Sequence, residues 1–161
     1  MTTSTTEPRP TPTILGLGRM GANMARRLAR GGITVHGFDP SADARRALSG
    51  EAGVRLHADL AASVVAQPGR RLVWLMLPAG AITEQTLGAL EALLRPGDVL
   101  VDGGNANYLD SQARARQWKA RGVDFVDCGV SGGVWGLAEG YCLMAGGEPD
   151  AIAAAGARGP L

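Results

Sequence analysis

Between residues 13 and 130, short apolar runs alternate with longer segments whose apolar residues recur at helical spacing. The runs predict strands and the longer segments predict helices, because only helices repeat every three to four residues. The expected strands are 13–18, 33–39, 54–58, 71–78, 99–102 and 123–130. The expected helices are 21–32, 40–50, 81–98 and 108–122.

Two of these segments show the pattern most clearly. Residues 71–78 are almost continuously apolar, which is typical of a strand buried on both faces of a parallel sheet. In 21–32, Met24, Ala25 and Leu28 share one helical face. Because parallel neighbours need crossover connections, strict alternation predicts an α/β fold of the Rossmann type, a doubly wound, mostly parallel sheet with helices on both faces.

The 161 residues suit one domain, which we place at 13–147. Residues 1–12 contain prolines and charges and no apolar core, so we expect a disordered leader and not a secretory signal. Residues 148–161 begin like a helix but then carry Gly156, Gly159 and Pro160, so we expect a truncated or irregular tail.

Composition narrows the class of protein. With 16 basic and 15 acidic residues, the formal net charge is +1, and the basic residues are scattered, which disfavours nucleic acid and anionic membranes as partners. No apolar run approaches the roughly 20 residues of a membrane-spanning helix. The two cysteines, Cys128 and Cys142, form no CxxC motif, which disfavours a metal site and favours buried thiols in a reducing, cytoplasmic environment.

A glycine motif follows the first expected strand. In "GLGRMG", Gly16, Gly18 and Gly21 have G-x-G-x-x-G spacing, with Leu17, Arg19 and Met20 between them. In this context the first glycine permits a tight turn, the second admits a pyrophosphate and the third lets the helix pack on the strand. The alternative is a glycine-rich turn that binds nothing.

Asp39 ends the second expected strand, near the offset at which an acidic residue binds the adenosine ribose. A carboxylate there repels a 2′-phosphate and favours NAD over NADP. Arg45 and Arg46 could instead reach such a phosphate, although a solvated helix face is the simpler interpretation. Asp39 could also be only the N-cap of its helix.

Three further loops follow later strands, where open α/β sheets bind their ligands. Leu77, Pro78 and Ala79 suit a wall against a flat ring. In "DGGNANY", two glycines open space beside Asn105, whose amide both donates and accepts hydrogen bonds. The third loop places Ser131 before Gly132 and Gly133, whose N–H groups can hold an anion. Any one of the three could be an ordinary turn.

The segments "ILGLGRMGANMARRL", "LPAG", "VDGGNANY" and "GVSGGVWGLAEGYCLMAGG" together resemble the NAD(P)-binding domain of 6-phosphogluconate dehydrogenase, in its short bacterial branch. The glycine motif is shared with 3-hydroxyisobutyrate dehydrogenase, whereas "DGGN" followed by "SGGVWG" points to the phosphogluconate branch. The family oxidises and decarboxylates 6-phosphogluconate to ribulose 5-phosphate in the pentose phosphate pathway.

The resemblance implies a role for each matching position. Residues 16–21 would hold the pyrophosphate, and Asp39, Pro40 and Ser41 would line the ribose pocket. Leu77, Pro78 and Ala79 would lie on the nicotinamide side, with Asn105 touching both cofactor and sugar acid. Ser131, Gly132 and Gly133 would bind the substrate.

The sequence departs from the family because it lacks the family's catalytic lysine and glutamate. In the family they lie on a helix beyond this domain, and an all-helical second domain follows. Family members dimerise largely through that second domain, so we expect a dimer only when it is present. The only lysine here, Lys119, ends a helix, and His36 and His57 belong to strands away from the substrate loops. We therefore expect a chain that is not catalytic alone. The alternatives are a non-catalytic dinucleotide-binding module and part of a 3-hydroxyisobutyrate-type β-hydroxyacid dehydrogenase.

Overall fold

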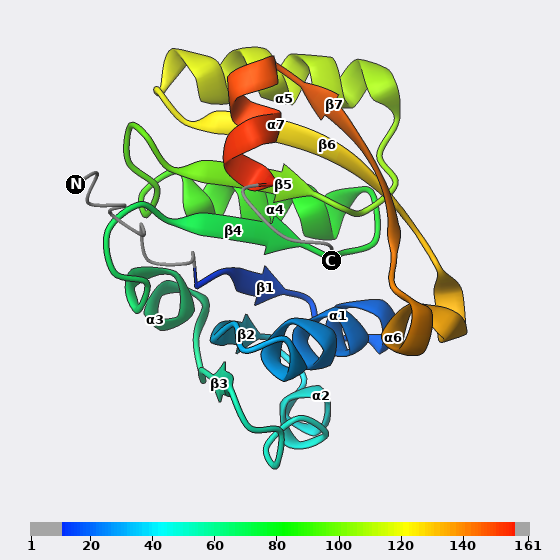
Figure 1. The fold of residues 1–161 in the computed structure, drawn as a ribbon. Helices are drawn as coiled ribbons and strands as arrows, with labels where there is room; N and C mark the ends of the chain where they lie inside the picture. The colour runs from blue at the N-terminus through cyan, green and yellow to red at the C-terminus, as the bar shows by residue number, and fades with distance from the viewer. Residues whose placement is uncertain (1–10, 157–161) are drawn as a thin grey trace, which may run out of the picture.

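The computed structural model describes residues 11–156, so residues 1–10 of the expected leader and residues 157–161 lie outside the described part. A seven-stranded sheet has the order β3-β2-β1-β4-β5-β6-β7 (Figure 1). Its strands are β1 (Thr13–Leu15), β2 (Val35–Phe38), β3 (Val54–Leu56), β4 (Leu72–Leu75), β5 (Val99–Asp102), β6 (Asp124–Ser131) and β7 (Cys142–Gly147). All pairings are parallel except that β7 runs antiparallel to β6. The expected mostly parallel α/β fold is confirmed.

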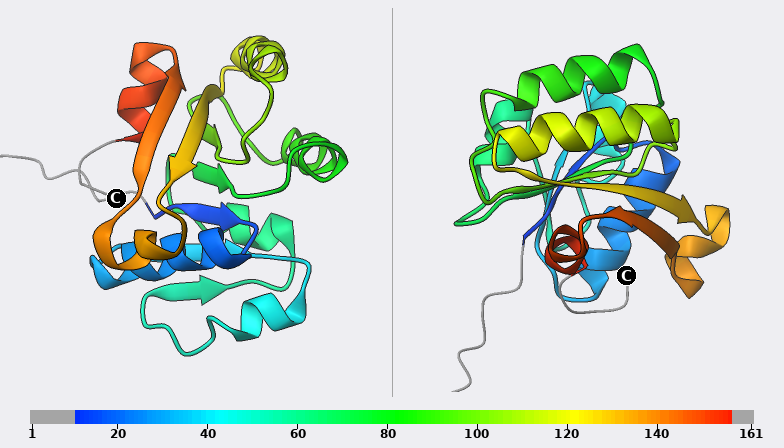
Figure 2. Two further views of the ribbon diagram at one scale, coloured as in Figure 1. Left: turned by 90° about the vertical axis from the view of Figure 1, so that its right-hand side faces the viewer. Right: turned by 90° about the horizontal axis from the view of Figure 1, so that it is seen from above.

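Helices cover both faces of the sheet, with α1 and α7 on one face and α3, α4 and α5 on the other (Figure 2). The helical elements are α1 (Arg19–Arg30), α2 (Ala42–Arg46), α3 (Leu60–Val65), α4 (Ala81–Leu90), α5 (Tyr108–Ala120), η1 (Gly133–Trp135), α6 (Gly136–Glu139) and α7 (Pro149–Ala155). None of these helices is long and apolar enough to cross a membrane.

Strand β4 shows why both faces need cover. Leu72 and Trp74 belong to the core cluster that includes the buried residues of α1, whereas Val73 and Leu75 belong to the cluster that includes those of α4 and α5. Successive side chains of a strand point to opposite faces, so a continuous apolar run must be packed on each side.

The sequence pattern did not predict helix α3, strand β7 or the short η1 and α6, and the expected helices 40–50 and 81–98 are shorter in the structure, at Ala42–Arg46 and Ala81–Leu90. Helix α3 has six residues, too few for helical spacing to stand out, and it is defined by its N-cap, where the Asp59 side chain accepts a hydrogen bond from Ala62 N at 2.7 Å. Strand β7 lies in a glycine-rich stretch with no alternating pattern. Its pairing with β6, in which Cys142 lies opposite Ser131, makes it a strand.

The two cysteines differ in exposure, so the expectation that both thiols are buried is wrong for Cys142, which lies exposed on the edge strand β7. Cys128 is buried, and burial, with the charge of Asp127, raises the pKa of its thiol to about 11.

His36 and His57 lie in contact, which the sequence did not predict. His36 Nδ1 lies 2.9 Å from His57 Nε2, which joins β2 to the residue that follows β3. Burial lowers the pKa of His36, and the charges of His57 and Arg55 lower it further. The pair lies at the β3 side of the sheet, apart from the loops that follow β4, β5 and β6.

Packed structure reaches beyond residues 13–147 at both ends. Pro12 is buried, and its carbonyl accepts a hydrogen bond from His36 N at 2.9 Å. At the other end α7 contacts β5, β6 and β7, and its Ala151 is 2% exposed.

Candidate functional site

The glycine motif and the three later loops lie at one edge of the sheet, because each follows the carboxyl end of a parallel strand. The helix after β1 covers one face and the helix after β4 covers the other (Figure 2). The winding of the chain therefore reverses between these neighbouring strands. Open α/β sheets bind ligands in the crevice that such a reversal creates.

The three motif glycines are in sterically different positions. Gly16 has φ 95°, and a Cβ there would lie 2.4 Å from Met76 O. A Cβ on Gly21 would lie 1.9 Å from Gly16 O, so only glycine lets α1 approach the turn. A Cβ on Gly18 would meet nothing within 4 Å. The fold thus requires Gly16 and Gly21, whereas the space beside Gly18 is open to a ligand.

Gly18 is also the N-cap of α1, where the first backbone N–H groups of a helix have no intrahelical partner. No side-chain hydrogen bond from the described residues 11–156 caps this end. The first turn contains no acidic residue. An uncapped helix start of this kind, beside a glycine that leaves room, is suited to a phosphate oxygen.

Asp39 fastens the end of β2 to the glycine turn. Its Oδ2 accepts a hydrogen bond from Leu17 N and its Oδ1 accepts one from Ser41 N, each at 2.8 Å. Pro40 and Ser41 follow on the surface, and the N-cap of α2 is Ser41, so Asp39 is not that N-cap. Each carboxylate oxygen keeps further acceptor capacity toward a ligand.

The two arginines of α2 differ. Arg45 is half-buried, and its Nη1 donates to the carbonyl oxygens of Asp39 and Pro40. The expectation of a solvated helix face is therefore wrong for Arg45. Arg46 is exposed and pairs with Asp43. Arg45 thus braces the loop that carries the acidic residue.

The loop after β4 packs against the glycine turn. Leu77 is half-buried, and a Cβ on Gly16 would lie 2.8 Å from Leu77 Cδ2. Pro78 and Ala79 are exposed, and Pro78 O accepts a hydrogen bond from Thr83 Oγ1 at 2.8 Å. The first turn of α4 therefore fixes this loop beside the glycine turn.

The loop after β5 holds Asn105 in an unusual conformation. Asn105 has φ 61°, and it is the one residue other than glycine with positive φ in the described part of the chain. Below it, Asp102 is 1% exposed, and its carboxylate accepts hydrogen bonds from Gly104 N at 2.9 Å and from Arg114 Nη1 at 2.8 Å. Burial raises the pKa of Asp102, while Gly104 and Arg114 oppose that rise.

The turn after β6 begins at Ser131, which is exposed. Gly132 has φ 147° and Gly133 has φ 47°, so both occupy backbone conformations that favour glycine. A Cβ on Gly133 would meet nothing within 4 Å, which leaves the turn open on its outer side.

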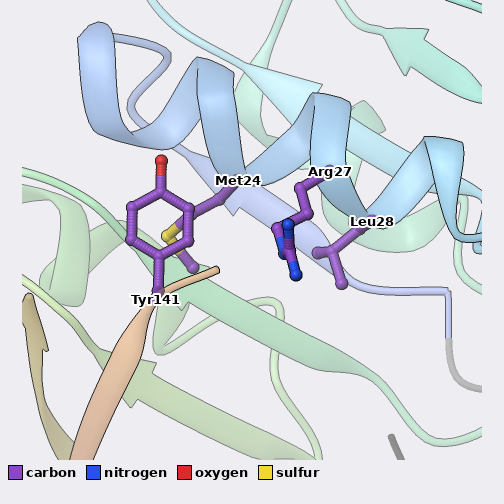
Figure 3. A pocket seen from close by; sticks show the side chains of 4 residues that line it. All are labelled: Met24, Arg27, Leu28 and Tyr141. Atoms are coloured by element: carbon purple, nitrogen blue, oxygen red, sulfur yellow. The ribbon is translucent and has the colours of Figure 1, made fainter. Parts of the chain in front are cut away.

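Tyr141 forms the floor of this turn. A Cβ on Gly136 would lie 2.2 Å from Tyr141 Cε1, so the ring packs directly on the backbone of α6. The ring also lies against Met24 of α1, near Arg27 and Leu28 (Figure 3). Arg27 Nη1 donates to Leu137 O at 3.2 Å. The helix that begins at the glycine motif therefore supports the Ser131 turn as well.

Lys119, the one lysine of the sequence, lies apart from these loops. Lys119 pairs with Glu148 at 3.2 Å near the start of β6, the end opposite Ser131. Within residues 11–156 no group of three or more histidine, cysteine, aspartate or glutamate side chains could hold a metal ion.

Sequence reasoning missed Arg114, Asp102 and Tyr141 as supports of these loops. For Arg114 a signal was present: Ser111, Arg114 and Trp118 are buried at i, i+3 and i+7 of a polar helix, the spacing of one helical face. For the other two, only the packing of separate elements shows the role.

Comparisons with known proteins agree with this arrangement. The model of the family described as the NAD binding domain of 6-phosphogluconate dehydrogenase matches residues 12–157. The NAD(+)-dependent, decarboxylating 6-phosphogluconate dehydrogenase of Haloferax volcanii is 41% identical over 135 residues, which are 83% of this chain and 44% of that protein. The decarboxylating 6-phosphogluconate dehydrogenase of Bacillus licheniformis is 34% identical over 88% of this chain and 31% of that protein. The chain therefore spans less than half the length of these relatives.

Solved structures show the same fold. The 3-hydroxyisobutyrate dehydrogenase of Mycobacterium tuberculosis, solved with L-serine, has a TM-score of 0.82 and 28% identity over 91% of this chain and 49% of that chain. The 6-phosphogluconate dehydrogenase of Plasmodium falciparum has a TM-score of 0.81 over 88% of this chain and 32% of that chain, and its 24% identity supports the fold alone.

Proposed function

The chain belongs to the 6-phosphogluconate dehydrogenase family as its NAD-binding domain, and from this membership we propose that it binds NAD at the turn between β1 and α1. The observation that carries the proposal is that the three glycines differ in the space around them. Protein atoms occupy the space where a Cβ of Gly16 or Gly21 would lie, whereas Gly18 faces open space at an uncapped helix start. The pyrophosphate would lie there, against residues 16–21.

The remaining cofactor contacts follow the same sheet edge. Asp39, Pro40 and Ser41 would line the adenosine ribose pocket, and Leu77, Pro78 and Ala79 would lie on the nicotinamide side. When bound, NAD supplies a hydride acceptor. The protein's part is to orient that ring, and the loop after β4 is suited to this because Thr83 fixes it and its outer residues are small.

We propose 6-phosphogluconate as the sugar acid, held by Asn105, Ser131, Gly132 and Gly133. An amide, a hydroxyl and an open glycine turn match the hydroxyl and carboxylate groups of a sugar acid. Oxidation and decarboxylation would belong to the whole enzyme, in which the family's lysine and glutamate supply proton transfer.

A titration monitored by NMR distinguishes this substrate from the main alternative. We expect 6-phosphogluconate, added to the isotope-labelled chain in the presence of NADH, to shift the amide signals of Asn105 and residues 131–133. We expect 3-hydroxyisobutyrate to shift them much less at equal concentration, because it offers fewer hydroxyl groups. The reverse order would assign the chain to a 3-hydroxyisobutyrate-type enzyme.

We further propose that the site prefers NAD to NADP. Asp39 places a carboxylate at the ribose pocket, and Arg45 is engaged with two backbone carbonyls and is not available to a 2′-phosphate. The NAD(+)-dependent relative from Haloferax volcanii supports the same choice.

Replacing Asp39 by asparagine should reduce the ratio of NAD to NADP affinity by about tenfold, or ~1.4 kcal/mol. Asparagine removes the charge that repels a 2′-phosphate, yet it keeps an acceptor for a loop N–H. Titration of wild type and variant with both reduced cofactors measures the ratio. Asp43→Asn is the matched control, since Asp43 is exposed and pairs with Arg46. An unchanged ratio of NAD to NADP affinity in Asp39→Asn would show that Asp39 does not determine the cofactor preference.

A further inference from the structure

Asn105 needs an external support to keep its conformation. A positive φ is unfavourable for a residue with a Cβ, although asparagine tolerates it better than most. The residue is exposed at the ligand edge of the sheet. Such strained residues persist where the surrounding structure determines them.

Part of the support is the glycine pair before Asn105. Gly103 N donates to Leu75 O at 2.9 Å, and a Cβ on Gly103 would lie 2.7 Å from Met76 Sδ. A Cβ on Gly104 would lie 2.4 Å from Leu77 O. The loop is thus pressed against the end of β4, and its close fit leaves no room for side chains.

The other part is a buried ion pair. Arg114 and Asp102 have side chains that are 6% and 1% exposed, and Arg114 Nη1 lies 2.8 Å from Asp102 Oδ2. The second carboxylate oxygen of Asp102 accepts the Gly104 N–H. A buried carboxylate depends on its partners, so the position of Gly104 depends on Arg114 through Asp102.

Arg114 also reaches a second loop. Its Nε lies 3.1 Å from Glu84 Oε1, and Glu84 lies in the first turn of α4, where its N–H donates to Gly80 O at 3.1 Å. That turn follows Leu77, Pro78 and Ala79. One guanidinium therefore connects α5 to both loops that flank the expected nicotinamide position, and its planar fork can serve two carboxylates at once.

We propose that Arg114 is a positioning residue for Asn105: by pairing with Asp102 and Glu84 it holds the loop after β5 and the start of α4 in one fixed arrangement at the nicotinamide end of the site. This inference rests on the proposed function for what Asn105 contacts. The φ of Asn105 can be measured without any ligand.

The first test concerns the ligand-free chain. A positive φ gives a strong intraresidue nuclear Overhauser effect between HN and Hα, and we expect it at Asn105 in the wild type. Arg114→Met should lose it. Because that variant leaves Asp102 buried and unpaired, the double variant Asp102→Asn/Arg114→Met, which leaves no unpaired buried charge, is measured beside it. Arg121→Met is the control, since Arg121 lies at the end of α5 that is far from the Asn105 loop, where it pairs with Glu91 and its guanidinium lies 5.9 Å from the centre of the Trp118 ring.

The second test separates positioning from general loss of structure. NADH contains the nicotinamide end and ADP-ribose does not. We expect the Arg114 variants to weaken NADH binding by about tenfold while ADP-ribose binding changes by less than about twofold, because the glycine turn and Asp39 are untouched. Arg114→Lys, which keeps the charge but not the fork, should fall between wild type and Arg114→Met.

Folded Arg114 variants that keep the Asn105 signal and the ratio of NADH to ADP-ribose affinity would overturn the proposal. Equal weakening of both ligands would also overturn it, since that indicates a structural role only. If the wild type binds neither nucleotide, the proposed function fails, and the Asn105 signal still decides whether Arg114 positions that residue.

Discussion

Replacing Gly18 by valine should leave the fold intact and weaken NADH binding by at least about tenfold. A Cβ at position 18 meets no atom within 4 Å, and the backbone there is extended, with φ −63° and ψ −173°, which valine accepts readily. A valine at this N-cap costs the helix about 1 kcal/mol. The side chain would instead occupy the space through which the pyrophosphate approaches the first turn of α1.

Fluorescence titration with NADH measures the affinity, and circular dichroism measures the fold. Gly50→Val provides the matched control, because a Cβ on Gly50 also meets nothing within 4 Å and the residue lies after α2, away from the glycine turn. Unchanged NADH affinity in a folded Gly18→Val chain would mean that the cofactor does not approach this turn.

Replacing Gly21 by alanine should affect stability and not only binding. We expect it to lower the free energy of unfolding by about 3 kcal/mol. The added Cβ would lie 1.9 Å from Gly16 O, so α1 would have to move away from the turn after β1. Met24, Ala25 and Leu28 of α1 belong to the same core cluster as Leu72 and Trp74 of β4, so that movement would disturb the core as well.

Gly88→Ala is the control for this substitution. Gly88 lies within α4, and a Cβ there would meet nothing within 4 Å, so alanine should stabilise the chain by about 0.5–1 kcal/mol. Denaturant unfolding of both variants gives the two free energies. If Gly21→Ala were as stable as the wild type, α1 would not pack on the glycine turn as described.

The fold was predictable because its signals are local. A continuous apolar run identified β4, and helical spacing in α1 placed Met24, Ala25 and Leu28 on one buried face. Parallel pairing then followed from the alternation of strands and helices. The glycine spacing also anticipated which glycine the fold leaves open, because each position has a separate steric requirement.

The supports of the site were not predictable in the same way. Arg114, Asp102 and Glu84 come from α5, β5 and α4, and only the folded chain brings them together. Strand β7 likewise depends on its partner β6 and not on its own glycine-rich sequence. Interactions between elements far apart in the chain leave little trace in local periodicity.

The central claim is that the turn between β1 and α1 holds a nicotinamide dinucleotide, and titration of the wild-type chain with NADH tests it most directly. We predict saturable binding in the micromolar-to-millimolar range, roughly 1 μM to 1 mM, usual for such ligands. We also predict that the backbone amide signals of residues 16–21 shift with the same midpoint. A flat titration, with those signals unmoved by NADH, would contradict the account.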